Sequence, residues 1–244
     1  MSSNRIAWLS PSDKPDAFPD VENALTEPNG LLAAGGDLSP ERMLFAYRNG
    51  IFPWYDDGQP ILWWSPDPRC VLRPRDLHIS RRLQQQVRNS TAQLRFNFAF
   101  ADVIRACAGQ RQSQQGTWIT DEMIDAFENL YAHGWAHSIE VWDDDELIGG
   151  VYGLYIGTVF FGESMFSAKA NASKMALWGL SKHIQDSELG LIDCQVVSQH
   201  LMTLGAAVVP RREFTEILDR ACDPPTRYAG WPQGPLAMTD MLRD

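Results

Sequence analysis

The sequence predicts an α+β fold built on one central sheet. Three runs follow one another in a meander with the period of strands, at 137–142, 146–155 and 158–163. Asp143-Asp144-Asp145 and Ile156-Gly157 supply the turns between these runs. Helical spacing and short apolar runs then alternate along the chain. A meander followed by helix, strand, helix, strand and helix is typical of helices layered on a single sheet.

The helices on either side of the meander follow from spacing and capping residues. A helix is expected at 39–49, where Ser39 is the N-cap, Pro40 takes the first position and Gly50 follows the end. Amphipathic spacing predicts three more helices before the meander, at 80–87, 99–108 and 120–133. After the meander we expect a helix at 171–188, a buried strand at 191–197, a short helix at 198–204, a strand at 206–209 and a helix at 211–222.

Composition divides the chain into three parts. Residues 1–67 are rich in Pro, Gly and Trp and are expected to form a small, turn-rich N-terminal domain. Residues 68–223 hold the other periodic elements and form the larger domain. Residues 224–244 contain Pro and Gly without a convincing period, so we expect a loosely attached tail.

Length and residue usage indicate a globular protein of the cytoplasm. At 244 residues and 44 % hydrophobic content, the chain is long enough to bury a sizeable core. It has no run of about 18 apolar residues and no hydrophobic signal core at its start, so neither membrane insertion nor export is expected. The four cysteines form no CxxC pair, which argues against a zinc ribbon or a disulfide framework and predicts reduced thiols.

Charge is distributed unevenly along the chain. The net charge of −10 argues against a nucleic-acid partner, because phosphate binding depends on Lys and Arg. Residues 69–111, however, contain nine Arg and two Asp, a local charge of +7, which leaves −17 on the remainder. This basic block is either a solvated helix face or a local site for a polyanion, and charge alone leaves both interpretations open.

Asp193 and Gln195 are the most informative polar residues. They lie two apart on an apolar run, so both side chains project from the same face of a strand. They either satisfy one another and the neighbouring backbone or line a site. Glu163 lies in an aromatic setting at the end of the meander, where it is either a strand-end carboxylate or part of the same site.

Other familiar sites are disfavoured by spacing. The run Gly162-Glu163-Ser164-Met165-Phe166 lacks the second Gly of a nucleophile elbow. His133 and His137 are separated by Gly134 and have no third ligand nearby, so no metal site is expected. Four Trp residues in turn-rich segments either stack on unpaired bases or fill the joint between the two domains: Trp54, Trp63, Trp64 and Trp118.

Nine short runs that occur in order between residues 18 and 214 are more specific than any of these single motifs. They are EPNGLL (27–32), GGDLSP (35–40), GIFPW (50–54), WWSPDPR (63–69), LHISR (77–81), GTWIT (116–120), AHSIE (136–140), GESMFS (162–167) and LIDCQ (191–195). Together these runs resemble the signature of the bacterial leucyl/phenylalanyl-tRNA–protein transferases.

That resemblance implies a small N-terminal α/β domain and a larger domain with an acetyltransferase-like (GNAT) core and a central mixed sheet. It implies Leu-tRNA or Phe-tRNA as donor, with Met as a further candidate, and proteins with an N-terminal Arg or Lys as acceptors. The product would be marked for degradation in the cytoplasm. No cofactor, metal, membrane or oligomer is expected. No Q/R-x-x-G-x-G/A run is present for the pyrophosphate of acetyl-CoA, which fits a different donor.

The resemblance also assigns residues position by position. Asp193 and Gln195 match the catalytic pair, and Glu163 matches a residue near the incoming N-terminus. The remaining assignments are an adenosine contact at Trp54 and Trp118, an apolar pocket for the donor side chain at Val151, Phe160, Leu177, Ile184 and Ile192, and an acceptor-stem contact at Arg73, Arg75, Arg81, Arg82 and Arg88. Two departures, Gln84-Gln85-Gln86 where relatives are more basic and Ser198 where Asn is common, bear on tRNA and peptide binding.

The expected mechanism joins an ester donor to an amine acceptor. We expect Asp193 to orient Gln195, whose amide oxygen accepts a hydrogen bond from the attacking amine. The final proton acceptor is Asp193, a water or the ribose hydroxyl. Two rival functions are an acetyl-CoA-dependent N-acetyltransferase, which the missing pyrophosphate run disfavours, and a non-catalytic RNA-binding module, which leaves Asp193 and Gln195 without a role.

Overall fold

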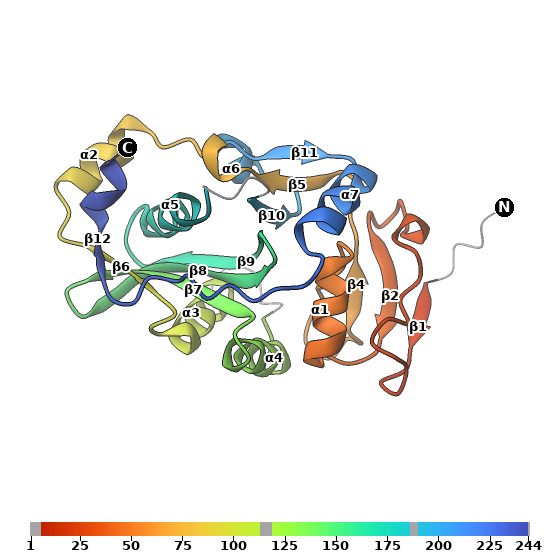
Figure 1. Cartoon of the computed structure of the whole chain (residues 1–244). Coiled ribbons are helices and arrows are strands. Elements are labelled where there is room, and N and C mark those ends of the chain that lie inside the picture. The colour runs from red at the N-terminus through yellow and green to blue at the C-terminus, as the bar shows by residue number, and fades with distance from the viewer. Residues whose placement is uncertain (1–5, 113–118, 186–189, 244) are drawn as a thin grey trace.

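Two sheets organise the chain in the computed structural model, which describes residues 6–112, 119–185 and 190–243 (Figure 1). The smaller sheet has four strands. They lie in the order β1 (Ala7–Leu9), β2 (Leu31–Gly35), β4 (Leu62–Trp64) and β3 (Phe52–Pro53). The pair β1 and β2 is parallel, and the other pairs are antiparallel.

The larger sheet has eight strands and is mixed. In spatial order they are β11 (Ala207–Val209), β5 (Arg69–Leu72), β10 (Leu191–Gln195), β9 (Val159–Ser167), β8 (Glu146–Ile156), β7 (Ala136–Asp143), β6 (Gln93–Phe96) and β12 (Leu236–Ala237). Strands β9 and β10 run parallel to one another, and the other neighbouring pairs are antiparallel. The predicted α+β class with a central mixed sheet is therefore confirmed at the level of a mixed α/β architecture.

Helices cover both faces of the larger sheet. On one face lie α5 (Ala172–Ile184) and α2 (Arg81–Arg88), and on the other lie α3 (Phe100–Gln112) and α4 (Asp121–Ala132) (Figure 1). Each layer buries its own apolar cluster, because side chains of alternate strand residues point to opposite faces. The remaining elements are α1 (Pro40–Arg48), α6 (Gln199–Thr203), α7 (Arg211–Ala221) and the 3-10 turns η1 (Val21–Asn23), η2 (Pro74–Asp76) and η3 (Met238–Leu242).

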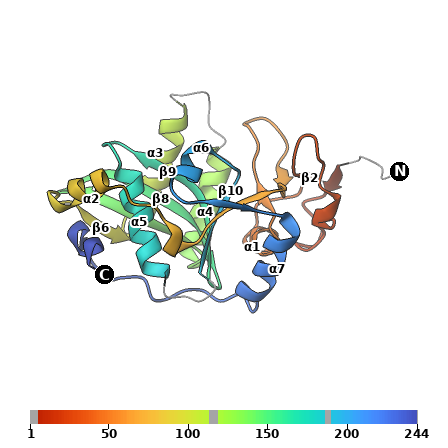
Figure 2. The same cartoon turned by 90° about the horizontal axis from the view of Figure 1, so that it is seen from above.

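Two helices, α1 and α7, lie between the small and the large sheet (Figure 2). Apolar residues of both regions form one continuous cluster across this junction, including Tyr47, Phe161 and Phe214. The start of α7 is fixed by the main-chain N–H of Arg211, which donates to the Asp67 carboxylate at 3.0 Å. Gly50, which ends α1 with a φ of 73°, faces the Phe214 ring so closely that an added Cβ would lie 3.3 Å from it.

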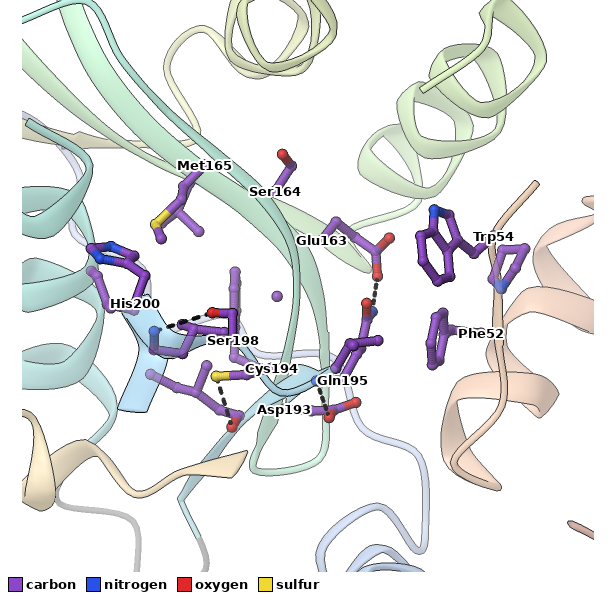
Figure 3. A pocket seen from close by; sticks show the side chains of 18 residues that line it. Phe52, Trp54, Glu163, Ser164, Met165, Asp193, Cys194, Gln195, Ser198 and His200 are labelled. Atoms are coloured by element: carbon purple, nitrogen blue, oxygen red, sulfur yellow. Dashed lines mark hydrogen bonds between the residues drawn. The ribbon is translucent and has the colours of Figure 1, made fainter. Parts of the chain in front are cut away.

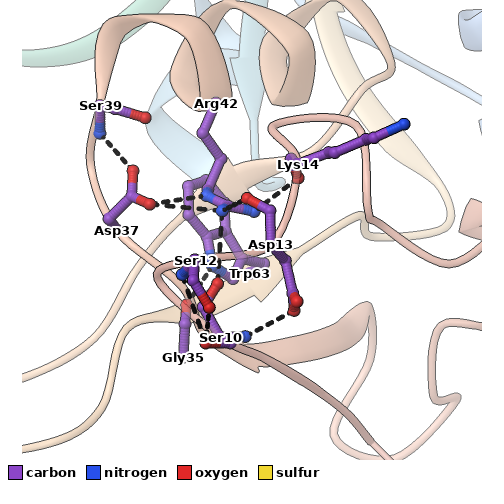
Figure 4. A network of polar contacts seen from close by, with 9 residues as sticks. All are labelled: Ser10, Ser12, Asp13, Lys14, Gly35, Asp37, Ser39, Arg42 and Trp63. Carbon is purple, nitrogen blue, oxygen red and sulfur yellow. Dashed lines mark hydrogen bonds and ion pairs between the residues drawn. The ribbon is translucent and has the colours of Figure 1, made fainter.

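A buried arginine fixes the N-terminal segment onto α1 (Figure 4). Arg42 is 1 % exposed and pairs with the Asp37 carboxylate at 3.3 Å. Its guanidinium also donates to the main-chain carbonyls of Ser10, Asp13 and Lys14. Because every donor group of a buried cation needs a partner, this set of acceptors holds the incoming chain in place.

The periodic elements agree closely with the sequence predictions. The three strands of the meander are observed as β7, β8 and β9, and the predicted helices are observed as α1 to α7. The predicted helix at 171–188 is described only through Ile184, and residues 186–189 lie outside the described part of the chain. The sequence did not indicate the strands within 1–67 or β5, β6 and β12, which are two to five residues long and too short to establish a period.

The C-terminal segment differs from the prediction of a loosely attached tail at 224–244. It crosses the molecule to the far edge of the larger sheet, where β12 pairs with β6 (Figure 1). Trp231 is 6 % exposed, with its ring 4.7 Å from that of His137 and 4.9 Å from that of His183. Met238 is fully buried. Apolar residues at irregular spacing thus anchor this segment without forming a recognisable period.

Candidate active site

A cavity of about 350 Å³ opens where β9 and β10 stop pairing (Figure 3). The last paired residues are Asp193 and Phe161, although both strands continue beyond them. The cavity is lined by Gly162, Glu163, Ser164 and Met165 of β9, by Asp193 to Val196, by Ser198, His200 and Leu201, by Val151, Phe160, Leu177 and Ile192, and by Phe52, Pro53 and Trp54. Residues of the small and the large sheet therefore share one site.

Asp193 is held by a buried ion pair. Its carboxylate accepts two hydrogen bonds from Arg69, from Nε at 2.9 Å and from Nη2 at 2.7 Å, and both side chains are at most 1 % exposed. The guanidinium lies between the rings of Phe52 and Phe214, 4.8 and 4.7 Å from their centroids. Arg69 also donates to the carbonyl of Gly50. Both oxygens of the Asp193 carboxylate are therefore occupied by donor groups of Arg69.

The backbone of Gln195 depends on Asp193. The main-chain N–H of Gln195 donates to Asp193 Oδ1 at 2.9 Å, and Gln195 has a φ of 60°, in the left-handed region. The strand is irregular between these two residues, which turns the Gln195 side chain toward the cavity. Asp193 thus contacts Gln195 through the backbone and leaves its side-chain amide to another partner.

That partner is Glu163. Its Oε1 accepts a hydrogen bond from Gln195 Nε2 at 2.7 Å and another from the Tyr47 hydroxyl at 2.7 Å. Since the Gln195 amide nitrogen is directed to Glu163, its amide oxygen is left to accept hydrogen bonds from elsewhere. The sequence prediction that Gln195 offers an amide oxygen is compatible with this geometry.

Burial changes the pKa of Glu163, a carboxyl group that lines the cavity. It is 6 % exposed, and burial raises its pKa to about 7, against the opposing effect of the hydrogen bonds from Tyr47 and Gln195. Its second oxygen, Oε2, is buried and has no hydrogen-bond partner within the described residues. A carboxyl group with a pKa near neutrality and a vacant oxygen is suited to accept and return a proton.

The other wall of the cavity is apolar. Four of the five residues expected to form the aminoacyl pocket line it, namely Val151, Phe160, Leu177 and Ile192. Ile184 does not; it is buried farther along α5 in the same apolar cluster. Met165 adds a side chain that the sequence did not indicate.

Of the two Trp residues expected to contact adenosine, only one can be placed. Trp54 lines the cavity and is 42 % exposed, with its ring 5.7 Å from that of Trp64. Trp118 lies outside the described residues. An exposed indole at the edge of a cavity is available for stacking on a base.

The basic block is not a uniform surface. Its five predicted acceptor-stem residues are all exposed, on and around η2 and α2: Arg73, Arg75, Arg81, Arg82 and Arg88. Arg69 is instead buried against Asp193, and Arg105 pairs with Glu128 at 2.7 Å. The net charge of this block in the sequence therefore overstates the number of Arg side chains that are available to contact phosphates.

Two residues of the site were not recognised in the sequence. Tyr47 lies 116 positions before Glu163, and Arg69 lies 124 positions before Asp193. The only available signal was a buried carboxylate on an apolar strand, which requires a donor from some other segment. Within the described residues, no cluster of three or more His, Cys, Asp or Glu side chains could hold a metal. No helix of that part of the chain is long and apolar enough to cross a membrane.

Two family models match successive parts of this chain. The family model for the leucyl/phenylalanyl-tRNA protein transferase matches residues 71–219, and the model for the N-terminal domain of that transferase matches residues 36–67. Relatives named leucyl/phenylalanyl-tRNA–protein transferase include one from Pseudomonas aeruginosa strain UCBPP-PA14, 53 % identical over 91 % of this chain and 97 % of its own length. Others are from Cellvibrio japonicus, 51 % identical over 91 % and 94 %, and from Azoarcus sp. strain BH72, 51 % identical over 92 % and 96 %.

Among solved structures, a C-terminal domain from Agrobacterium fabrum overlaps 75 % of this chain and 57 % of its own. The TM-score is 0.36 and the sequence identity 10 %. Those values are too low to assign a shared fold.

Proposed function

Because this chain belongs to the leucyl/phenylalanyl-tRNA–protein transferases, aminoacyltransferases that move Leu or Phe from aminoacyl-tRNA to protein amino termini, we propose that the β9–β10 cavity is where transfer occurs. The observation that carries this proposal is that a single cavity has one apolar wall and one polar wall. An apolar wall faces a polar wall that contains Glu163 and Gln195. The donor side chain needs the first wall, and the attacking amine needs the second.

The donor ester binds with its amino acid against Val151, Phe160, Leu177 and Ile192. These side chains can hold Leu, Phe or Met by burial of apolar surface, and they discriminate single methylenes by only about 1–3 kcal/mol. The terminal adenosine stacks on Trp54, whose exposed indole supports this placement. A contact with Trp118 remains a prediction. The exposed Arg residues of η2 and α2 then meet the phosphates of the acceptor stem.

The polar wall aligns and deprotonates the acceptor. The α-ammonium of a peptide has a pKa of about 7.7–8.0, so much of it is protonated at neutral pH. Glu163, with a pKa of about 7, can accept that proton on Oε2 at little free-energy cost. Gln195 Oε1 accepts a hydrogen bond from the same nitrogen and fixes its direction of attack. Asp193 and Arg69 act as positioning residues behind Gln195.

The reaction exchanges the ester bond of the donor for an amide bond to the acceptor. The amine nitrogen attacks the ester carbonyl carbon, and the bond to the ribose oxygen breaks. The proton held by Glu163 passes to the ribose oxygen as it leaves, which regenerates the carboxylate. The nitrogen loses one further proton as the amide forms, and this proton passes to solvent water. The step needs no ATP, because an ester is converted into a more stable amide.

Acceptors with an N-terminal Arg or Lys are favoured by the same carboxylate. Asp193 is neutralised by Arg69, so Glu163 is the carboxylate without a cationic partner among the described residues that line the cavity. We further propose that the reaction takes place in the cytoplasm and marks the acceptor for degradation, and that the larger domain has an acetyltransferase-like core. Separation of two parallel central strands around the site supports this last assignment.

Transfer of labelled Leu tests the function and the acceptor rule together. Purified protein is incubated with radiolabelled Leu-tRNA and peptides that differ only in their first residue, Arg, Lys, citrulline or Ala. Citrulline matches the shape of Arg without its charge. Label in acid-stable peptide with Arg and Lys, and little with citrulline or Ala, is the expected result. No label on any peptide, from folded protein that binds the tRNA, contradicts transfer, whereas equal label on citrulline and Arg contradicts the charge rule.

A further inference from the structure

Two of the four cysteines meet beside the cavity. Cys70 lies in the middle of β5 and Cys194 near the end of β10, and these strands are antiparallel neighbours. The residue facing Cys70 across the pair is Gln195, with a shift of register between Asp193 and Gln195. Cys194 is therefore the extra residue of a β-bulge, next in the chain to the residue that faces Cys70.

Alternation along both strands places the two thiols on the same face of the sheet. Arg69 and Asp193 contact each other on one face. The next residue on each strand, Cys70 and Cys194, belongs to the apolar cluster on the opposite face, beneath α5. Side chains of adjacent strands that share a face lie within reach of one another. Both cysteines are free thiols in this structure.

The two thiols are also close enough to affect one another: the Cys194 thiol lowers the pKa of Cys70, and the Cys70 thiol raises the pKa of Cys194. The Cys194 S–H donates to the Ile192 carbonyl oxygen at 3.9 Å. Cys70 is fully buried, whereas Cys194 is partly exposed and lines the cavity. Figure 3 shows the Cys194 sulfur among the residues that surround the cavity. A small oxidant that enters the cavity thus meets one thiol with a second thiol behind it.

We propose that Cys70 and Cys194 form a reversible disulfide in the presence of peroxide, and that this disulfide suppresses aminoacyl transfer. The Cys194 sulfur attacks one peroxide oxygen and the O–O bond breaks. The departing oxygen takes the proton of the Cys194 thiol and leaves as water, and Cys194 becomes a sulfenic acid. The Cys70 sulfur then displaces the hydroxyl of that sulfenic acid, which forms the S–S bond and releases a second water. The two thiols lose two electrons and two protons in total, and the peroxide is reduced.

Oxidation acts on transfer through the neighbours of Cys194. Asp193 precedes it and holds the Gln195 backbone, and Gln195 follows it and contacts Glu163. A disulfide draws the Cys194 backbone toward β5 and so moves the Gln195 amide away from its position in the cavity. Displacement of an aligning group by about 1 Å is enough to slow a reaction about a hundredfold. This second half of the proposal depends on the transfer function proposed above; the first half does not.

Peptide mass mapping and transfer assays test the two halves separately. The full-length protein is treated with hydrogen peroxide and divided into two portions. One portion is alkylated and digested for mass mapping, and the other is assayed for transfer before and after treatment with dithiothreitol. A cross-linked peptide pair containing Cys70 and Cys194 is expected, with at least about a tenfold loss of transfer that the reductant reverses. Sulfenic or sulfinic acid at Cys194 without that cross-link overturns the disulfide. The cross-link with full transfer overturns the suppression.

Variants separate this pair from other sites of oxidation. Cys70→Ser is expected to keep transfer and to lose its reversible inhibition, since Cys70 lies behind the cavity wall. Cys70→Ala covers the case in which a buried hydroxyl impairs folding. Cys222→Ser is the matched control, because Cys222 is equally buried but belongs to the apolar cluster on the other face. Inhibition that dithiothreitol reverses in both Cys70 variants contradicts the proposal. If the protein were inactive before peroxide treatment, that result would count against the proposed transfer function. The peptide mass map would still show whether the Cys70–Cys194 disulfide forms.

Discussion

Removal of the Asp193 carboxylate is expected to destabilise the fold as well as the site. Asp193→Ala leaves the Arg69 guanidinium buried, 1 % exposed, and without its counter-charge. Breaking a buried ion pair from one side costs about 3–5 kcal/mol, because the remaining charge stays desolvated. The substitution removes two hydrogen bonds from a charged donor and a third from the Gln195 main-chain N–H. We therefore expect the free energy of unfolding to fall by about 3–5 kcal/mol.

A second substitution separates the effect of the unpaired Arg69 charge from the effect of losing the acceptor for the Gln195 backbone. Arg69→Met removes the stranded cation and keeps an apolar chain between the rings of Phe52 and Phe214. The double variant is expected to be about 2 kcal/mol more stable than Asp193→Ala alone. The gain is limited because the Gly50 carbonyl loses its donor. Transfer activity is not expected to return, since the Gln195 backbone remains without its acceptor.

Urea unfolding followed by circular dichroism measures these differences for the two single variants and the double variant. Transfer assays at a temperature where all variants are folded give the activities. If Asp193→Ala cost less than about 1 kcal/mol, or if Arg69→Met made it less stable still, the ion pair would not be the source of the effect. Full activity in the double variant would contradict the positioning role of Asp193.

Three further changes probe the tail, the basic surface and the apolar wall. Trp231→Ala should lower the free energy of unfolding by about 3–5 kcal/mol in urea titrations, and a cost below about 1 kcal/mol would indicate a detached tail. The double variant Arg81→Ala, Arg82→Ala should bind tRNA more weakly in filter-binding assays. The slope of log affinity against log salt concentration should fall by about one for each phosphate that the protein no longer neutralises. An unchanged slope would indicate that the acceptor stem binds elsewhere. Val151→Phe should narrow the pocket and lower kcat/KM for Phe-tRNA about tenfold more than for Leu-tRNA, and equal losses would contradict the placement of the donor side chain.

Sequence periodicity was sufficient for the elements that are long and amphipathic. Strands β7, β8 and β9 and helix α5 each show several repeats of their period. The three strands lie next to one another in the larger sheet, and α5 packs against it. Strands such as β3 and β12 have two residues each, so their pairing depends on contacts with distant segments. The prediction for the C-terminal segment was wrong for the same reason. Its attachment depends on contacts that Trp231 makes with residues far away in the sequence.

Several residues that line the candidate site could be identified from the sequence, but their hydrogen-bond partners could not. Glu163, Asp193 and Gln195 could be singled out as polar groups on apolar strands, and the parallel pairing of β9 and β10 brings them together. Their partners could not be predicted, because Tyr47 and Arg69 are more than 100 residues away in the chain. Arg69 was counted with the surface charges because net charge contains no information about burial.

The pH dependence of a single turnover tests the role of Glu163 most directly. Because burial raises the pKa of Glu163 to about 7, the carboxylate that accepts the proton is lost as pH falls below that value. We predict that the rate of transfer to an Arg peptide rises through an inflection near pH 7. Glu163→Gln, which still accepts the hydrogen bond from Tyr47, should slow transfer about 10²–10⁴-fold. Its inflection should move up to that of the peptide amine, about 7.7–8.0. An unchanged rate and an unchanged profile in Glu163→Gln would contradict Glu163 as the proton acceptor.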